Sequence, residues 1–245
     1  MQIVAAAHSH VGRRSTNEDA FLVAPKLGLY VVADGMGGYE GGEVASRLVV
    51  ESLRDFFAEN SVDPDLTWPV ALDPAVGMVA NELFAGVMLA QRVVLKERNG
   101  RLQQMGSTVV AVALDVDQAI IAHLGDSRAY RFRDGVLEQL TRDHSYAELL
   151  RASGGEVPPG FGHVITRAIG RPEEGPPEMM RTRLRARDRL LLCSDGLSDV
   201  LSADEMTSIF RSSDGPEDLA RCLVEEAYVA GGSDNITALV LEAKA

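Results

Sequence analysis

The chain has few cysteines, and those present do not indicate disulfide or thiol chemistry. Cys193 and Cys222 are the two cysteines in 245 residues, and they lie in a predicted strand and a predicted helix. Small buried thiols are expected there, in a reducing compartment. Neither cysteine is followed by a phosphate-cradling loop that ends in arginine, so covalent phosphate transfer to a cysteine is excluded.

Basic residues are outnumbered by acidic ones. The chain has 24 Lys and Arg against 36 Asp and Glu, which gives a net charge of −12 and a pI near 4.9. Nucleic acids and anionic membranes are bound through clustered Lys and Arg, so neither is an expected partner. No uninterrupted apolar run approaches transmembrane length, and the N-terminus MQIVAAAHSH has no basic lead. We therefore expect a cytoplasmic protein.

Several nucleotide and zinc motifs are also missing. The stretch GMGGYEGG has Glu40 where GxGxxG needs glycine, and no GxxxxGK occurs. A zinc hydrolase would use histidines at helical spacing, but no HExxH occurs, and each histidine is expected on the surface or in a satisfied core position. The histidines are His8, His10, His123, His144 and His163.

The hydrophobic pattern predicts one α+β domain over 1–245. Short apolar runs alternate with two pairs of helical patterns, and no repeat or long linker divides the chain. We expect an antiparallel meander over 107–140, and a mobile, glycine- and proline-rich loop over 152–163. The other predicted strands are 2–8, 20–24, 28–33, a pair near 178–184 and 189–194, and NITALVLEA at the end; the predicted helices are 43–58, one opened by Asp73 and Pro74, one capped by Ser202 and Glu205, and 216–231.

Four aspartates lie beside small residues along the chain. Asp34 in DGMGG, Asp126 in GDSR and Asp195 in SDG each end an apolar run, and Asp234 lies in SDN. Taken singly, each motif is typical of a turn. Together they predict carboxylates gathered at one sheet edge, where hard cations such as Mg²⁺, Mn²⁺ or Ca²⁺ would neutralise them. Two such ions about 3.5–4 Å apart can activate a water for attack on phosphorus.

The whole chain resembles the metal-dependent serine/threonine protein phosphatases of type 2C, in their compact bacterial form. Eight motifs occur in the order typical of that family. They are RSTNEDA (14–20), VVADGMGGYEGGEVAS (31–46), GSTVV (106–110), HLGDSRAYRFRDG (123–135), LTRDHS (140–145), ITRAIG (165–170), LLLCSDGLSDV (190–200) and GGSDNITALV (231–240).

The resemblance implies a fold and a set of site residues. The fold is a sandwich of two central antiparallel sheets flanked by helices on both outer faces, with a flap near 146–163. Asp34 would bridge two Mn²⁺ or Mg²⁺ ions, with the Gly35 carbonyl on one and two further aspartates on the other. Asp195 and Asp234 are the two aspartates implied for the second ion, and Glu18 would act through a water. Arg14 would bind the phosphate, and Asp126 with Asp195 would hold a third, weaker ion.

The chain departs from the family at two positions. Met36 stands where eukaryotic members have a histidine proposed as general acid, and Tyr39 stands where many bacterial members have a histidine. Methionine cannot donate a proton, so the resemblance leaves the general acid open between a metal-bound water and another nearby group. We expect Tyr39 to be structural.

The implied activity is hydrolysis of phosphoserine and phosphothreonine in proteins by direct attack of a metal-bridging hydroxide. The expected partners are phosphoproteins, including a Ser/Thr kinase and its targets, and the protein is expected to be a monomer. Two alternatives remain: a binding module with the same fold but no activity, and a phosphatase for one regulatory phosphoprotein. The sequence does not choose between Mn²⁺ and Mg²⁺.

Overall fold

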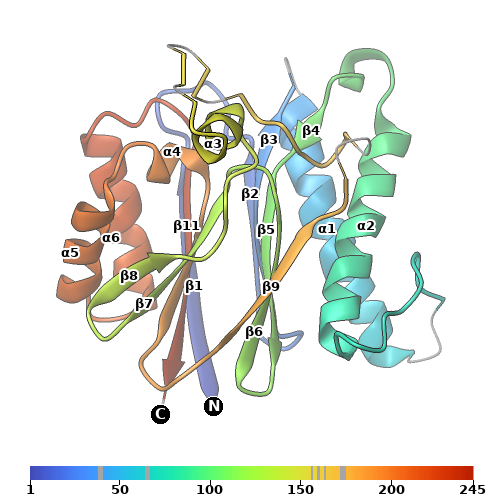
Figure 1. The fold of residues 1–245 in the computed structure, drawn as a ribbon, viewed down its shortest axis with the longest axis horizontal. Coiled ribbons are helices and arrows are strands. Elements are labelled where there is room, and N and C mark those ends of the chain that lie inside the picture. Colours follow the sequence, from blue (N-terminus) through green and yellow to red (C-terminus); the bar gives the residue numbers. More distant parts are fainter. Residues whose placement is uncertain are drawn as a thin grey trace.

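Two antiparallel sheets pack face to face, with helices on each outer side (Figure 1). The computed structural model describes residues 1–37, 41–63, 67–155, 157–158, 161–162, 164–171 and 175–244. One sheet has the strand order β1-β11-β10-β7-β8, and the other β2-β3-β5-β6-β9 with β4 paired to β3. The strands are β1 Gln2–His10, β2 Asp19–Ala24, β3 Leu29–Met36, β4 Gly106–Ser107, β5 Val109–Asp115, β6 Gln118–Leu124, β7 Arg128–Arg133, β8 Val136–Gln139, β9 Glu178–Arg183, β10 Arg189–Cys193 and β11 Ile236–Lys244.

The helices form two covering layers. The long pair α1 and α2 lies on the β3-containing sheet, and α5 and α6 lie on the β11-containing sheet (Figure 1). This confirms the predicted α+β sandwich. The helices are α1 Gly41–Val62, α2 Met78–Glu97, the 3₁₀ turn η1 Gly100–Leu102, α3 Tyr146–Ala152, α4 Asp195–Ser198, α5 Ala203–Ser212 and α6 Pro216–Val229.

The central strands are buried on both faces, which explains their unbroken apolar runs. In β3, Leu29, Val31 and Ala33 pack toward α1 and α2, while Tyr30 and Val32 face the other sheet. Successive side chains of a strand point to opposite faces, so LYVVA fills two cores at once. This double burial fixes the register of β3, and so the position of Asp34 within it.

Two of the strand predictions were wrong about pairing. The predicted meander over 107–140 is divided, because β5 and β6 lie in one sheet while β7 and β8 lie in the other. The predicted pair β9 and β10 is divided in the same way: β9 pairs with β6, and β10 with β7 and β11. Turn residues mark where a strand ends but not which sheet receives the next one. The crossing from β6 to β7 contains Asp126.

The helices differ from prediction mainly at their starts. The second begins at Met78 rather than at Asp73, because Asp73 and Asn81 exchange two hydrogen bonds of 2.7 and 2.8 Å that hold a turn before it. Gly77 then takes a φ of 87°, which ends the turn. The predicted capping box of Ser202 and Glu205 is confirmed at α5.

Among the described helices, α2 is long and apolar enough to cross a membrane by length and composition. Half of its most apolar window is buried inside the protein. Leu83, Val87 and Val94 on that helix belong to the core shared with α1 and the sheet.

The predicted flap is described in part. Its first residues form α3, where the Ser145 side chain accepts a hydrogen bond from the Glu148 amide. Residues 156, 159–160 and 163, which include His163 and part of the predicted mobile loop, lie outside the described residues.

Candidate active site

A cleft of about 460 Å³ opens at one end of the sandwich, and it gathers most of the predicted site residues. Asp34 lies in β3, Asp195 follows β10, and Asp234 precedes β11. The carboxylates therefore come from both sheets, and the expectation that they share one sheet edge was wrong. The cleft is lined by Arg14, Ser15, Thr16, Glu18, Asp34, Gly35, Met36, Gly37, Ile165, Asp195, Asp234 and Asn235.

Asp126 is the one predicted site residue that does not line this cleft. It is 7% exposed, in the loop between β6 and β7. Its charge raises the pKa of Asp34, and the charge of Asp195 raises the pKa of Asp126, so Asp126 lies near both. The structure thus brings all seven predicted residues to one end of the sandwich.

Close backbone packing brings the end of β3 to this place. The Gly35 amide donates to the Glu18 carbonyl at 3.1 Å, and a Cβ atom on Gly35 would lie 2.0 Å from the Gly42 carbonyl oxygen. Only glycine fits between β3 and the start of α1. The Asp34 amide also donates to Thr108 Oγ1 at 3.0 Å, which fixes the strand from the β5 side.

The clustered carboxyl groups hold protons more tightly than usual. Burial raises the pKa of Asp34 well above its ordinary range, and the charges of Asp19, Asp195 and Asp126 raise it further. Burial, with Asp195 nearby, raises the pKa of Asp126 to about 7, and burial followed by Asp199 and Asp234 raises the pKa of Asp195. Like charges this close cannot all ionise without a counter-charge.

The donor set fits hard divalent cations. In the described part of the chain, Asp19 Oδ1, Asp126 Oδ1 and Asp195 Oδ1 are buried and make no hydrogen bond. Buried acceptors are normally satisfied, so these oxygens need a partner that the protein does not supply. Carboxylate oxygens are what Mg²⁺ and Mn²⁺ prefer, and a cation would also lower the mutual repulsion.

Sequence reasoning missed Asp19. Its Oδ2 accepts hydrogen bonds from Ser194 Oγ at 2.8 Å and Thr237 Oγ1 at 2.6 Å, and it lies opposite Asp34 in the β2–β3 register. Burial, opposed by these bonds, raises its pKa to about 7. The signal was present in NEDA, where the residue beside Glu18 is also acidic.

Asn235 fixes the loop that carries Arg14 and Glu18, and it was also missed. Its Nδ2 donates to the carbonyls of Val11 and Thr16, both at 2.9 Å, and its Oδ1 accepts from the Glu18 amide at 2.8 Å. The side chain is 4% exposed. One buried amide therefore orders the whole loop against β11.

Arg14 reaches into the cleft from this loop. Its Nη2 lies 2.8 Å from Asp234 Oδ2, and its side chain is 59% exposed. At that exposure the ion pair contributes little to stability. The guanidinium stays accessible to an anion in the cleft.

A second group of potential ligands lies on the flap side. Side-chain atoms of His123, His144 and Glu178 converge within 4.8 Å. However, His144 Nδ1 accepts a hydrogen bond from the Gly125 amide at 3.1 Å, and His144 Nε2 lies 3.1 Å from Glu178 Oε1. Arg167 Nη1 lies 2.9 Å from that nitrogen and 3.0 Å from Glu178 Oε1. A protein cation already fills this position, so a metal is better placed among the aspartates.

The two departures in the glycine-rich motif have different outcomes. Met36 is the last residue of β3 and lines the cleft. Tyr39 lies outside the described residues, so its expected structural role stays a prediction.

Comparison with known proteins identifies the family of this chain. Residues 6–226 match the family described as protein phosphatase 2C. The chain belongs to the protein phosphatase 2C family. It is 33% identical over 241 residues to the serine/threonine phosphatase stp of Listeria innocua, covering 94% of this chain and 91% of that one. This confirms the resemblance read from the motifs.

Two further comparisons involve PstP of Mycobacterium tuberculosis and its catalytic domain. This chain is 34% identical to PstP over 235 residues, which is 94% of this chain, and it spans 42% of that relative's length. The crystal structure of the PstP catalytic domain in complex with two manganese ions superposes with a TM-score of 0.83 at 33% identity, covering 99% of both chains. The superposition confirms the phosphatase 2C fold.

The role of Asn235 is testable by substitution. Replacing Asn235 by Ala removes three buried hydrogen bonds, so we expect a loss of about 2–4 kcal/mol in the free energy of unfolding. Hydrogen exchange in residues 11–18 should become faster, since the loop loses its anchor. Asn99→Ala, which removes one exposed bond to Glu97, is the control and should change stability by less than about 0.5 kcal/mol. Unchanged exchange in residues 11–18 would contradict the role.

The carboxyl cluster predicts that the stability of the protein, measured in the presence of a chelator, depends on pH. The folded pKa values of Asp19 and Asp126 are raised to about 7, so the folded state binds more protons than the unfolded state between their ordinary pKa and 7. Stability is then lost as the pH rises through 7, by about 1–3 kcal/mol between pH 6 and 8. Asp126→Asn should reduce this slope. Urea unfolding at both pH values measures it, and a stability that rises with pH would contradict the assignment.

Proposed function

We propose that the protein hydrolyses phosphoserine and phosphothreonine in other proteins, using Mn²⁺ or Mg²⁺. The observation that carries the proposal is the convergence of Asp34, Asp195 and Asp234 from two sheets into one cleft that also contains Arg14. A cleft built from acids repels phosphate unless cations and a placed arginine offset its field. The chain supplies the arginine and the carboxylates that would hold the cations.

The aspartates would hold the two ions of the core site. Asp34 would hold both ions and the Gly35 carbonyl one of them, and Asp195 and Asp234, which line the same cleft from the other sheet, would hold the second. Glu18 lines the cleft and would act through a water. Two manganese ions are present in the related PstP catalytic domain. Bound there, such ions supply an activated water and stabilise charge on phosphate oxygens.

Arg14 would grip the phosphate. Its planar guanidinium presents paired N–H donors that match two phosphate oxygens. Its ion pair with Asp234 holds it at the cleft, while its exposure leaves donors free for an incoming anion. Asn235 fixes the loop, so Arg14 and Glu18 keep their positions relative to Asp234.

The leaving oxygen of serine or threonine needs a proton, and Met36 has none to donate. The donor would therefore be a metal-bound water or another group in the cleft. Asp126 would hold a third ion together with Asp195, since both have a buried oxygen without a hydrogen bond. The segment near 146–163, which precedes the cleft residue Ile165 in the chain, would be a flap of the single catalytic domain 1–245.

We further propose a monomeric cytoplasmic enzyme whose partners include a Ser/Thr kinase and its targets. An inactive binding module would be expected to lose acidic ligands, and this chain retains all of them. A phosphatase dedicated to one regulatory phosphoprotein would be supported by an additional sensor domain.

The assignment is tested by removing single charges. Asp195→Asn and Asp234→Asn should each weaken Mn²⁺ binding and lower hydrolysis of a phosphothreonine peptide by at least about a hundredfold, because second-position ligands are lost. Asp117→Asn is the control, since Asp117 lies in the β5–β6 turn and pairs with Arg183. Unchanged manganese-dependent hydrolysis in the Asp195 and Asp234 variants would overturn the proposal.

A further inference from the structure

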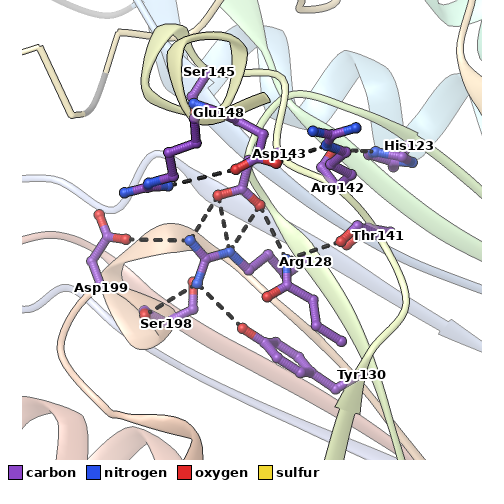
Figure 2. A network of polar contacts seen from close by, with 12 residues as sticks. His123, Arg128, Tyr130, Thr141, Arg142, Asp143, Ser145, Glu148, Ser198 and Asp199 are labelled. Carbon is purple, nitrogen blue, oxygen red and sulfur yellow. Dashed lines mark hydrogen bonds and ion pairs between the residues drawn. The ribbon is translucent and has the colours of Figure 1, made fainter. Parts of the chain in front are cut away.

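Arg128 is a largely buried arginine that none of the proposed catalytic roles uses. It is the first residue of β7, two positions after Asp126, and its side chain is 20% exposed. Its guanidinium contacts two other segments of the chain, and it also lies 3.3 Å from Tyr130 Oη in its own strand (Figure 2). Burying a cation is costly unless its donors are satisfied, so these contacts indicate a specific arrangement.

The first contact is with Asp143, in the segment before α3. Arg128 Nε lies 2.9 Å from Asp143 Oδ1, and Arg128 Nη2 lies 2.7 Å from Oδ2. The Asp143 side chain is 12% exposed. This is the fork-to-fork geometry that gives an arginine–carboxylate pair its directional precision.

The second set of contacts is with the end of α4. Arg128 Nη1 donates to the Ser198 carbonyl at 3.3 Å, and Nη2 lies 3.9 Å from Asp199 Oδ1 (Figure 2). Helix α4 begins at Asp195 and ends at Ser198. A helix of one turn is about 6 Å long, so fixing its last carbonyl also fixes the residue at its start.

The segment that carries Asp143 also holds the other side of the Asp126 loop. The His144 amide donates to the Gly125 carbonyl at 2.9 Å, and the Gly125 amide donates to His144 Nδ1 at 3.1 Å. Asp126 therefore lies between two anchored neighbours, Gly125 and Arg128. Both anchors come from Asp143 and His144, which are adjacent in the chain.

We propose that Arg128 is a positioning residue that fixes Asp126 and Asp195 relative to each other, so that they can share a third metal ion. The inference rests on the proposed function of this site. Arg128 touches neither substrate nor metal in this role. It joins the Asp126 loop to the helix that carries Asp195, and it opposes the repulsion between the two carboxylates by holding their backbones in place.

A purely structural ion pair of the same kind exists in the same strand. Arg133 Nε lies 2.8 Å from Asp188 Oδ1 and its Nη2 lies 2.5 Å from Oδ2, with side chains 18% and 2% exposed. In the register of β7 with β10, Arg128 pairs with Cys193, next to the cleft, while Phe132 pairs with Arg189 at the other end. The Arg133–Asp188 ion pair is therefore a matched control at the other end of β7, away from Asp126 and Asp195.

The experiment measures Mn²⁺ binding to the full chain, with free Mn²⁺ counted by electron paramagnetic resonance. In wild type we expect two tighter sites and one weaker site. Arg128→Lys keeps the charge but loses the fork, and it should weaken the weakest site by about 10–100-fold while the other two stay within about twofold. Arg128→Ala should abolish that site, and Arg133→Ala should leave all three unchanged.

Each alternative result has a definite meaning. The inference is overturned if the weakest site survives unchanged in Arg128→Lys and Arg128→Ala, if wild type has no third site, or if Arg133→Ala weakens it equally. Circular dichroism of each variant checks folding. If Arg128→Ala does not fold, the metal binding of Arg128→Lys alone tests the inference. If wild type binds three ions as predicted but does not hydrolyse phosphopeptides, the proposed function fails and the role of Arg128 stands.

Discussion

The mutual repulsion of carboxylates held together at the seam of two sheets is the constraint on which this structure depends. Burial and neighbouring carboxylates raise the pKa of Asp34, Asp126 and Asp195. Such a cluster costs stability unless something from solution neutralises it. The fold accepts that cost at one end of the sandwich, and two hydrophobic cores and a hydrophobic layer between the sheets offset it elsewhere.

The groups around the cluster orient the carboxylates without neutralising them. Hydroxyls of Ser194 and Thr237 fix Asp19, and Thr108 fixes the backbone at Asp34. Arginines stand at the edges, with Arg14 at the cleft mouth and Arg128 behind the loop of Asp126. Neutral donors at the centre and cations at the rim leave the central oxygens open to divalent ions, which is the arrangement a preorganised metal site requires.

The sequence predicted more of the site than of the topology. Strand ends are marked locally by apolar runs that stop at aspartate, so Asp34, Asp126 and Asp195 could be found without knowing which sheet each strand joins. The pairing of strands β6 to β10 could not be predicted, because turn residues do not encode whether the chain crosses between sheets. Asp19 and Asn235 were missed for a related reason. Their roles depend on contacts with Thr237 and Val11, each more than 200 positions away in the chain.

X-ray diffraction at the manganese absorption edge, from crystals of this protein grown with Mn²⁺, tests the central claim most directly. The account predicts two strong anomalous peaks among Asp34, Asp195 and Asp234, and a weaker one between Asp126 and Asp195. Peaks at His123, His144 and Glu178 instead, or no peak among the aspartates at saturating Mn²⁺, would contradict it.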